Sequence, residues 1–152
     1  MKRSKKLRLS ADMTETIHCD IVSPEGEIFS GSAKMVFVPA IQGELGIAPR
    51  HAPLLTLLKA GEVRVLTLEG TEQSFFVGGG ALEIQPKKIT VLADSAQRSK
   101  DLDEAAALEA KQSAEDVLAG NIDKVDQAEA LAELMRAVAQ LKMLEKLRKG
   151  RI

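Results

Sequence analysis

The sequence predicts an α+β chain in which an antiparallel β-sandwich, or flattened barrel, is followed by an antiparallel two-helix hairpin. All 5 prolines, 9 of the 11 glycines and all 4 phenylalanines precede residue 87, whereas 11 alanines follow residue 97. Turn formers mixed with β-branched and aromatic residues are typical of strands, and alanine-rich polar sequence is typical of helices. We therefore expect a sandwich docking domain over residues 13–96 and a regulatory hairpin over 97–152.

Residues 1–12 are set apart by their charge, with five basic side chains against one acidic one. Such a stretch fits a nucleic-acid arm or an anchor for anionic lipid. No apolar segment follows it, which excludes a signal peptide, and no aromatic residue accompanies the bases. We therefore interpret it as a disordered extension or an upstream start and expect no nucleic-acid partner.

The first region divides into short apolar segments separated by turn signals. This spacing favours a sandwich or a flattened barrel. The turn at residues 23–26 separates the first two segments, and residues 43–46 are interpreted as a tight loop with Glu44 at its tip. A proline-bracketed turn is expected at residues 49–53. We expect strands at residues 16–22, 34–38, 54–58, 63–68, 74–77, 81–84 and 89–92.

The second region reads as two amphipathic helices. Asp101 and Glu104 resemble a capping box, and Gly120 with Asn121 suggests a left-handed cap that ends the first helix. A second helix is expected to begin near Asp123. The apolar stripes are Leu102, Ala106, Ala110, Ala114, Val117 and Leu118, then Ala128, Leu131, Leu134, Met135, Val138, Leu141 and Leu144. Small side chains bury little area, so the hairpin should be held weakly and could take two positions.

Residues able to perform catalysis are scarce. His18 and Cys19 are adjacent on an expected strand and so point to opposite faces, which argues against a shared metal. The three glycines at 78–80 lack the Lys and Ser/Thr of a phosphate loop, and we interpret them as a bulge or a close backbone approach. No nucleophile motif is present. We expect no enzyme, no metal and no cofactor, and the single cysteine fits a reducing compartment.

The remaining features suit docking to a partner. Lys142, Lys146 and Lys149 are spaced so that they share one side of the second helix. That row could meet an acidic surface on a partner, or it could be an ordinary solvated face near a helix carboxyl end.

A set of short motifs occurs in a specific order along the chain. It comprises residues 30–31, 43–47, 51–56, 79–86, 89–94 and 101–105. Over residues 14–148 the sequence resembles the epsilon subunit of bacterial F-type ATP synthases, a family with a β-sandwich followed by a helical hairpin. The resemblance implies a peripheral rotor subunit at the cytoplasmic face of the bacterial plasma membrane, without a membrane span.

The resemblance also implies partners. The subunit would couple gamma to the c ring during proton-driven ATP synthesis. Glu44 matches the position that meets the c ring, and His51, Ser23 and Thr56 are carried over as candidates for the gamma-facing surface. The hairpin would inhibit ATP hydrolysis when it extends and pairs with an acidic segment of the beta subunit. The candidate residues for that pairing are Arg136, Lys142, Lys146, Arg148 and Lys149.

One departure concerns nucleotide. Some relatives bind ATP through a motif whose first residues match Leu102 and Asp103, but Ala106 stands where the motif has arginine. Loss of a fixed cation weakens a phosphate contact. We therefore expect weak or no ATP binding. The alternative functions are a free-standing nucleotide-sensing module or another protein-docking module.

Overall fold

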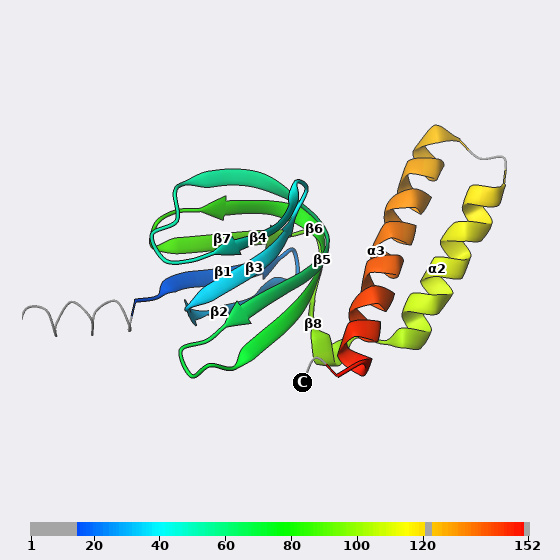
Figure 1. The fold of residues 1–152 in the computed structure, drawn as a ribbon. Coiled ribbons are helices and arrows are strands. Elements are labelled where there is room, and N and C mark those ends of the chain that lie inside the picture. The colour runs from blue at the N-terminus through cyan, green and yellow to red at the C-terminus, as the bar shows by residue number, and fades with distance from the viewer. Residues whose placement is uncertain (1–14, 121–122, 151–152) are drawn as a thin grey trace, which may run out of the picture.

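A computed structural model describes residues 15–120 and 123–150, so the predicted extension over residues 1–12 lies outside the described residues. A β-sandwich and a helical hairpin lie side by side (Figure 1). The strands are β1 Ile17–Ser23, β2 Gly26–Ala33, β3 Met35–Ala40, β4 Gly43–Ile47, β5 Leu54–Leu66, β6 Glu72–Ile84, β7 Lys88–Ala93 and β8 Ala96–Arg98. A 3-10 turn η1, Ser99–Asp101, leads to α2, Glu104–Ala119, and α3, Lys124–Arg148.

The strands form one sheet that folds over itself. Their order is β2-β1-β7-β6-β5-β3-β4, with β8 pairing with β6. Both β5 and β6 run for 13 residues and take part in both layers: the end of β6 pairs with β7, and its beginning pairs with β8. The pair β1–β7 is parallel, whereas the other strand pairs that the structure describes are antiparallel.

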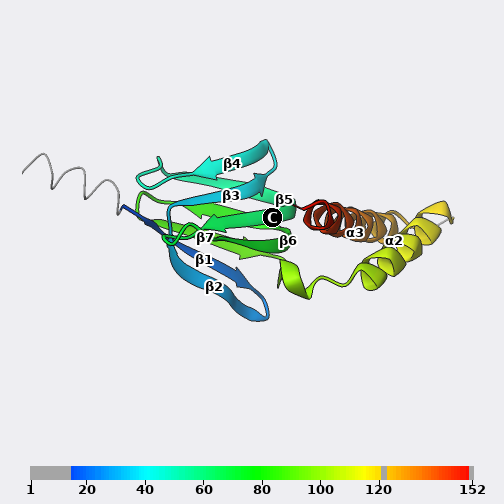
Figure 2. The same cartoon turned by 60° about the horizontal axis from the view of Figure 1, so that its bottom comes forward.

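The core lies between the two layers and is built from alternate residues of each strand. Phe75, Ile21 and Val65 are completely buried. Figure 2 shows the strands stacked above and below this space. Arg98 links β8 to β2 and β6: its Nη2 donates to the Ile28 carbonyl at 3.0 Å, and its guanidinium lies 5.5 Å from the centre of the Phe75 ring.

Three strand predictions need correction. Residues 43–46 form β4, because an edge strand can carry glycines while its partner β3 supplies the hydrogen bonds. Residues 26–33, for which no strand was predicted, form β2. The segments on either side of Gly61 are one continuous strand, β5, and those on either side of the three glycines are one strand, β6.

The three glycines lie where β6 bends from one layer to the other. A Cβ on Gly80 would lie 2.1 Å from the Leu92 carbonyl oxygen, so only glycine lets β7 approach so closely. Gly79 and Gly80 also have positive φ angles of 105° and 141°. The predicted close backbone approach is therefore present.

The hairpin ends also differ from the sequence expectation. Asp103, not Asp101, caps α2, because its carboxylate accepts from the amides of Ala105 and Ala106. Gly120 has φ −85° and ψ 170°, an extended conformation in place of the predicted left-handed cap, while Asn121 lies outside the described residues. Asp123 is the N-cap position of α3, as predicted.

Helix α3 is the helix that packs against the sandwich, and α2 lies on its far side (Figures 1 and 2). The buried residues of the hairpin are Ala107, Ala114, Ala130, Ala137 and Met143. Alanine therefore dominates the buried positions of the hairpin, as expected, although Ala106 is exposed and its neighbour Ala107 occupies the buried position. Neither of these helices is long and apolar enough, over its described residues, to cross a membrane.

Candidate functional site: docking surfaces of the sandwich and the hairpin

The outer face of the β5–β6–β7 layer carries exposed apolar side chains. Leu57, Ala81 and Leu92 are paired across the three strands, and the amide of Ile41 donates to the Leu57 carbonyl at 3.0 Å. Leu55 lies two residues before Leu57 and therefore shares its face. We call Ile41, Leu55, Leu57, Ala81 and Leu92 the outer apolar row.

The outer apolar row is too exposed to contribute much to folding. Leu55 is 75% exposed, Leu57 59%, Ile41 57% and Leu92 52%. A contiguous apolar patch of this kind marks a surface that another molecule covers. Sequence reasoning missed it, although the leucine-rich run at residues 54–58, interrupted by Thr56, was a usable signal, because strands covered on both faces are typically apolar at successive positions.

The candidates for gamma binding lie around this row. Thr56 points away from Leu55 and Leu57 into the sandwich, where it is buried and exchanges hydrogen bonds with Gln42 at 3.0 and 3.2 Å. Ser23 is also buried, and its hydroxyl holds the β1–β2 turn through Gly26 and Glu25. Both side chains therefore stabilise the backbone near the outer apolar row, and they offer little area for a partner to contact.

His51 lies in the turn that leads into β5. Its Nδ1 donates to the Ala52 carbonyl at 2.7 Å, and its side chain is half-buried. The turn is held by the amide of Arg50, which donates to the Pro86 carbonyl at 2.9 Å, and Arg50 takes a left-handed φ of 64°. The proline-bracketed turn is thus a fixed feature at the end of the outer apolar row.

Glu44 lies on the edge strand β4 and is 56% exposed. Arg64 of β5 forms a salt bridge to it at 2.8 Å and lies at 3.7 Å from Glu72. The guanidinium of Arg64 also stacks over the Phe37 ring at 4.3 Å, which fixes its position. Glu44 is thereby held as an oriented carboxylate at the rim of the sandwich.

The basic residues of α3 fall into two groups in the docked hairpin. Arg148 forms a salt bridge with Glu104 at the start of α2, and Lys149 pairs with Glu145 at 3.0 Å. Lys142 and Lys146 instead line a cleft between α3 and β5, and Arg136 lies against Gly78 at the bend of β6. The predicted row is therefore divided: Lys142 and Lys146 line the cleft, whereas Lys149 lies at the solvent-exposed end of α3.

Two residues at the positions of the nucleotide motif are not available to bind phosphate: Asp103 already accepts hydrogen bonds, and Ala106 carries no charge. The Asp103 carboxylate caps α2, and Ala106 offers an exposed methyl group in the first turn of that helix. The first helix therefore presents no arginine at the motif position. Weak or absent ATP binding stays a prediction.

A polar cluster on β1, β2 and β7 was not predicted. Asp20 accepts from Ser30 at 2.6 Å, lies 2.8 Å from His18 Nε2 and 3.3 Å from Lys88 Nζ. The hydrogen bond from Ser30, helped by those from His18 and Lys88, lowers the pKa of Asp20 against the opposing effect of desolvation. The Ser30 hydroxyl and His18 Nε2 both meet the same carboxylate oxygen, so the cluster lacks the relay geometry of a hydrolytic triad.

Cys19 points to the opposite face of β1 from His18, as predicted. The thiol is completely buried, and desolvation followed by the charge of Asp20 raises its pKa to about 12. No group of three His, Cys, Asp or Glu residues suited to a metal ion occurs in the described part of the chain.

We expect the Cys19 thiol to be inert in the folded chain, because at pH 8 it is protonated and inaccessible. A colorimetric thiol reagent should react with it only after denaturation. Rapid reaction of the native chain at pH 8 would contradict the burial of the Cys19 thiol in β1. The single cysteine makes the readout unambiguous.

These surfaces place the chain in the class of docking proteins. Its sandwich and its hairpin both present surfaces for partners, and the described residues form no catalytic centre. A family model for the ATP synthase delta/epsilon chain β-sandwich domain matches residues 16–99, and one for the long alpha-helix domain of the same chain matches residues 100–145. The chain belongs to the epsilon-chain family of bacterial F-type ATP synthases.

Full-length relatives agree. The ATP synthase epsilon chain of Nitrosococcus oceani is 58% identical over 137 residues, which cover 90% of this chain and 98% of that one. ATP synthase epsilon chain 1 of Methylococcus capsulatus is 56% identical over 140 residues, covering 91% and 99%. The predicted family and its non-catalytic role in the complex are therefore confirmed.

Solved structures share the fold. A chain of the Euglena gracilis mitochondrial ATP synthase superposes with a TM-score of 0.75 at 14% identity, covering 85% of this chain and 81% of that one. A chain in the Tetrahymena thermophila central stalk and c-ring structure gives 0.62 at 11% identity, covering 84% and 96%. The predicted sandwich followed by a helical hairpin is confirmed.

Proposed function

We propose that this chain is a central-stalk subunit that couples the gamma subunit to the c ring, peripherally at the membrane, and that its hairpin restrains ATP hydrolysis. The outer apolar row carries the coupling part of the proposal. Four of its side chains are more than half exposed on a rigid sheet, which suits a permanent protein partner such as gamma. His51, Ser23 and Thr56 surround that contact.

We assign the c-ring contact to the rim that carries Glu44. Its carboxylate is oriented by Arg64, so it can accept hydrogen bonds from polar loops without first being ordered. The outer apolar row is held on the β5–β6–β7 layer, while Glu44 lies on β4 at one end of the strand order. One sandwich thus offers two surfaces of different chemistry to two partners.

The regulatory part rests on how α3 is held. Helix α3 meets the sandwich at the bend of β5 and β6, and a cleft lined by Val138, Ala139 and Lys142 lies between them, so little of the helix surface is buried there. The free energy that separates a docked from an extended hairpin is therefore small, and a partner with modest differential affinity can shift it.

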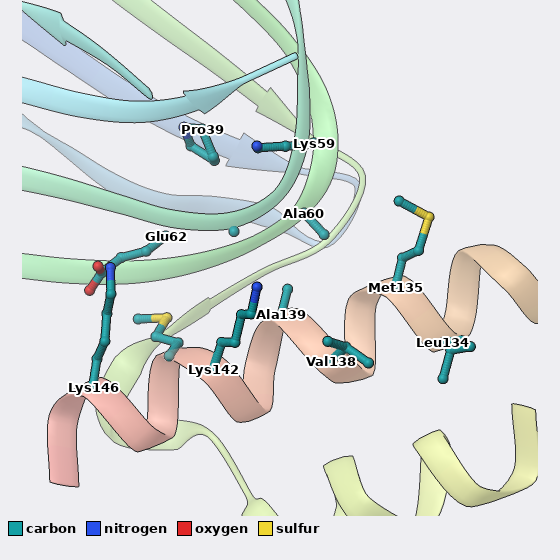
Figure 3. Close-up of a pocket in the computed structure, with 12 residues that line it drawn as sticks. Pro39, Lys59, Ala60, Glu62, Leu134, Met135, Val138, Ala139, Lys142 and Lys146 are labelled. Atoms are coloured by element: carbon teal, nitrogen blue, oxygen red, sulfur yellow. The ribbon is translucent and has the colours of Figure 1, made fainter. Parts of the chain in front are cut away.

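The basic residues supply that differential affinity. In the docked state Arg148 and Lys149 pair with Glu104 and Glu145 of the same chain. Figure 3 shows Lys146 directed towards Glu62 of β5. Extension of the hairpin would carry Lys146 away from the sandwich, and separation of α3 from α2 would release Arg148 from Glu104. Both cations would then be available to an acidic segment of the beta subunit. We include Arg136 and Lys142 in the same basic surface.

Reversal of Lys142, Lys146 and Lys149 to glutamate should raise the ATPase activity of the assembled enzyme several-fold, because close charge pairs across an interface contribute on the order of 1.5 kcal/mol or more each. The measurement is steady-state ATP hydrolysis, with incorporation of the subunit checked on the purified complex.

The matched control reverses three lysines that lie elsewhere on the hairpin and its connection, Lys100, Lys111 and Lys124. It should leave hydrolysis unchanged. Unchanged hydrolysis for the first triple variant, with the subunit still bound, would refute the proposal. A decrease would refute it too, because it would mean that these lysines dock α3 and do not pair with beta.

A further inference from the structure

A cleft lies between the carboxyl-terminal half of α3 and the bend of β5. Its volume is about 560 Å³, within the range of small-molecule sites. Figure 3 shows Met135, Val138 and Ala139 on the helix wall and Pro39 with Ala60 on the sandwich wall. The floor includes the buried side chain of Met143. Most of the lining is therefore apolar.

Three lysines and one glutamate are the charged residues that line this apolar cleft. Lys59 lies on the sandwich wall, Lys142 and Lys146 lie on the helix wall, and Glu62 is the acidic lining residue (Figure 3). Lys146 is directed at Glu62, whereas Lys59 and Lys142 form no salt bridge with an acidic side chain of the described chain. Two ammonium groups on opposite walls thus adjoin an apolar surface.

We propose that this cleft binds an acyl anion, a medium- or long-chain carboxylate. The carboxylate would lie between Lys59 and Lys142, and the tail would lie along Met135, Val138 and Ala139. An apolar cation would meet the wrong charge, and a short carboxylate would leave the apolar wall unfilled. The thioethers of Met135 and Met143 suit a flexible tail, because methionine adapts its shape to its neighbour.

Such a ligand would act on the hairpin, because its two contact walls belong to different parts of the chain. It binds only while α3 is docked, so its binding free energy adds to the stability of the docked state. The proposal goes beyond the proposed function, which assigns no small molecule to this subunit. It needs neither gamma nor beta and is tested on the full chain alone.

The test is calorimetric titration of the full chain with laurate, kept below its micelle concentration. We expect one saturable site per chain. Dodecyltrimethylammonium, with the same tail and a positive head, and acetate, with the head alone, should not bind. Lys142→Gln should weaken laurate binding about tenfold, the effect of losing one charge-assisted contact. Lys111→Gln, a matched neutralisation on α2, should leave it unchanged.

Hydrogen exchange provides a second readout that does not depend on a variant. Laurate should slow exchange of α3 amides near Val138 in the wild-type chain, because it holds that helix against β5. Equal binding of the cationic detergent, unchanged affinity in Lys142→Gln, or the absence of saturable laurate binding would each overturn the proposal. None of these outcomes bears on ATP hydrolysis by the assembled enzyme.

Discussion

Substitution of Gly80 by alanine is expected to lower the free energy of unfolding by about 3–5 kcal/mol, because two costs add. The φ angle of 141° is one that side-chain-bearing residues rarely adopt. The new Cβ would also lie 2.1 Å from the Leu92 carbonyl oxygen and 2.9 Å from the Ala93 Cα, both backbone atoms of the paired strand. Denaturant unfolding followed by circular dichroism measures the loss.

Alanine substitutions at two other glycines measure the conformational cost and the steric cost separately. Gly43→Ala carries the conformational cost alone, since φ is 131° and no atom lies within 4 Å of the new methyl group. Gly78→Ala meets mainly the Ser95 hydroxyl and the Arg136 side chain, which can move. Both should destabilise less than Gly80→Ala. A Gly80→Ala chain as stable as Gly43→Ala would show that β7 does not approach β6 as described.

Substitution of Leu57 by aspartate should weaken binding of the gamma subunit by about 100-fold or more, if the outer apolar row is the centre of that interface. The side chain is 59% exposed, so its loss removes little from the core of the free subunit. A carboxylate at this position would be desolvated on binding without a partner. Binding is measured by surface plasmon resonance with purified gamma.

Leu68→Asp is the matched control, because Leu68 is 44% exposed and follows the end of β5, outside the outer apolar row. It should bind gamma normally. Thermal unfolding of both variants must match that of the wild type within a few degrees. If Leu57→Asp binds normally, gamma docks on another face of the sandwich.

The sequence was most informative where local chemistry determines the structure. The turn at Ser23 and the strand at residues 89–92 follow from turn formers and apolar patterning. The second helix begins after Asp123, a residue type favoured at the N-cap, although the side chain of Asp123 makes no capping hydrogen bond. The sequence was misleading where tertiary pairing overrides a local signal. Gly61 and the three glycines at 78–80 read as breaks, yet β5 and β6 continue because each completes the other's hydrogen bonds through the bend.

The docking surfaces were predictable only in part. The carried-over positions Ser23 and Thr56 lie beside the outer apolar row, but their side chains are buried, and the exposed neighbours Leu55 and Leu57 offer the contact area. The pairing of Arg148 with Glu104 joins residues 44 positions apart, and periodicity within one helix cannot reveal it. Long-range pairs depend on how α2 and α3 face each other.

The connection between sandwich and hairpin sets the range over which the hairpin can act. Arg98 is fixed to the Ile28 carbonyl and the Phe75 ring, and only η1 and two further residues separate it from α2. With so short a connection to α2, a hairpin released as a unit stays at an effective concentration of the order of millimolar near its own binding surface. Recapture is then intramolecular and independent of how much subunit is present. Any partner that holds the hairpin open must therefore outcompete a local binding site that dilution cannot remove.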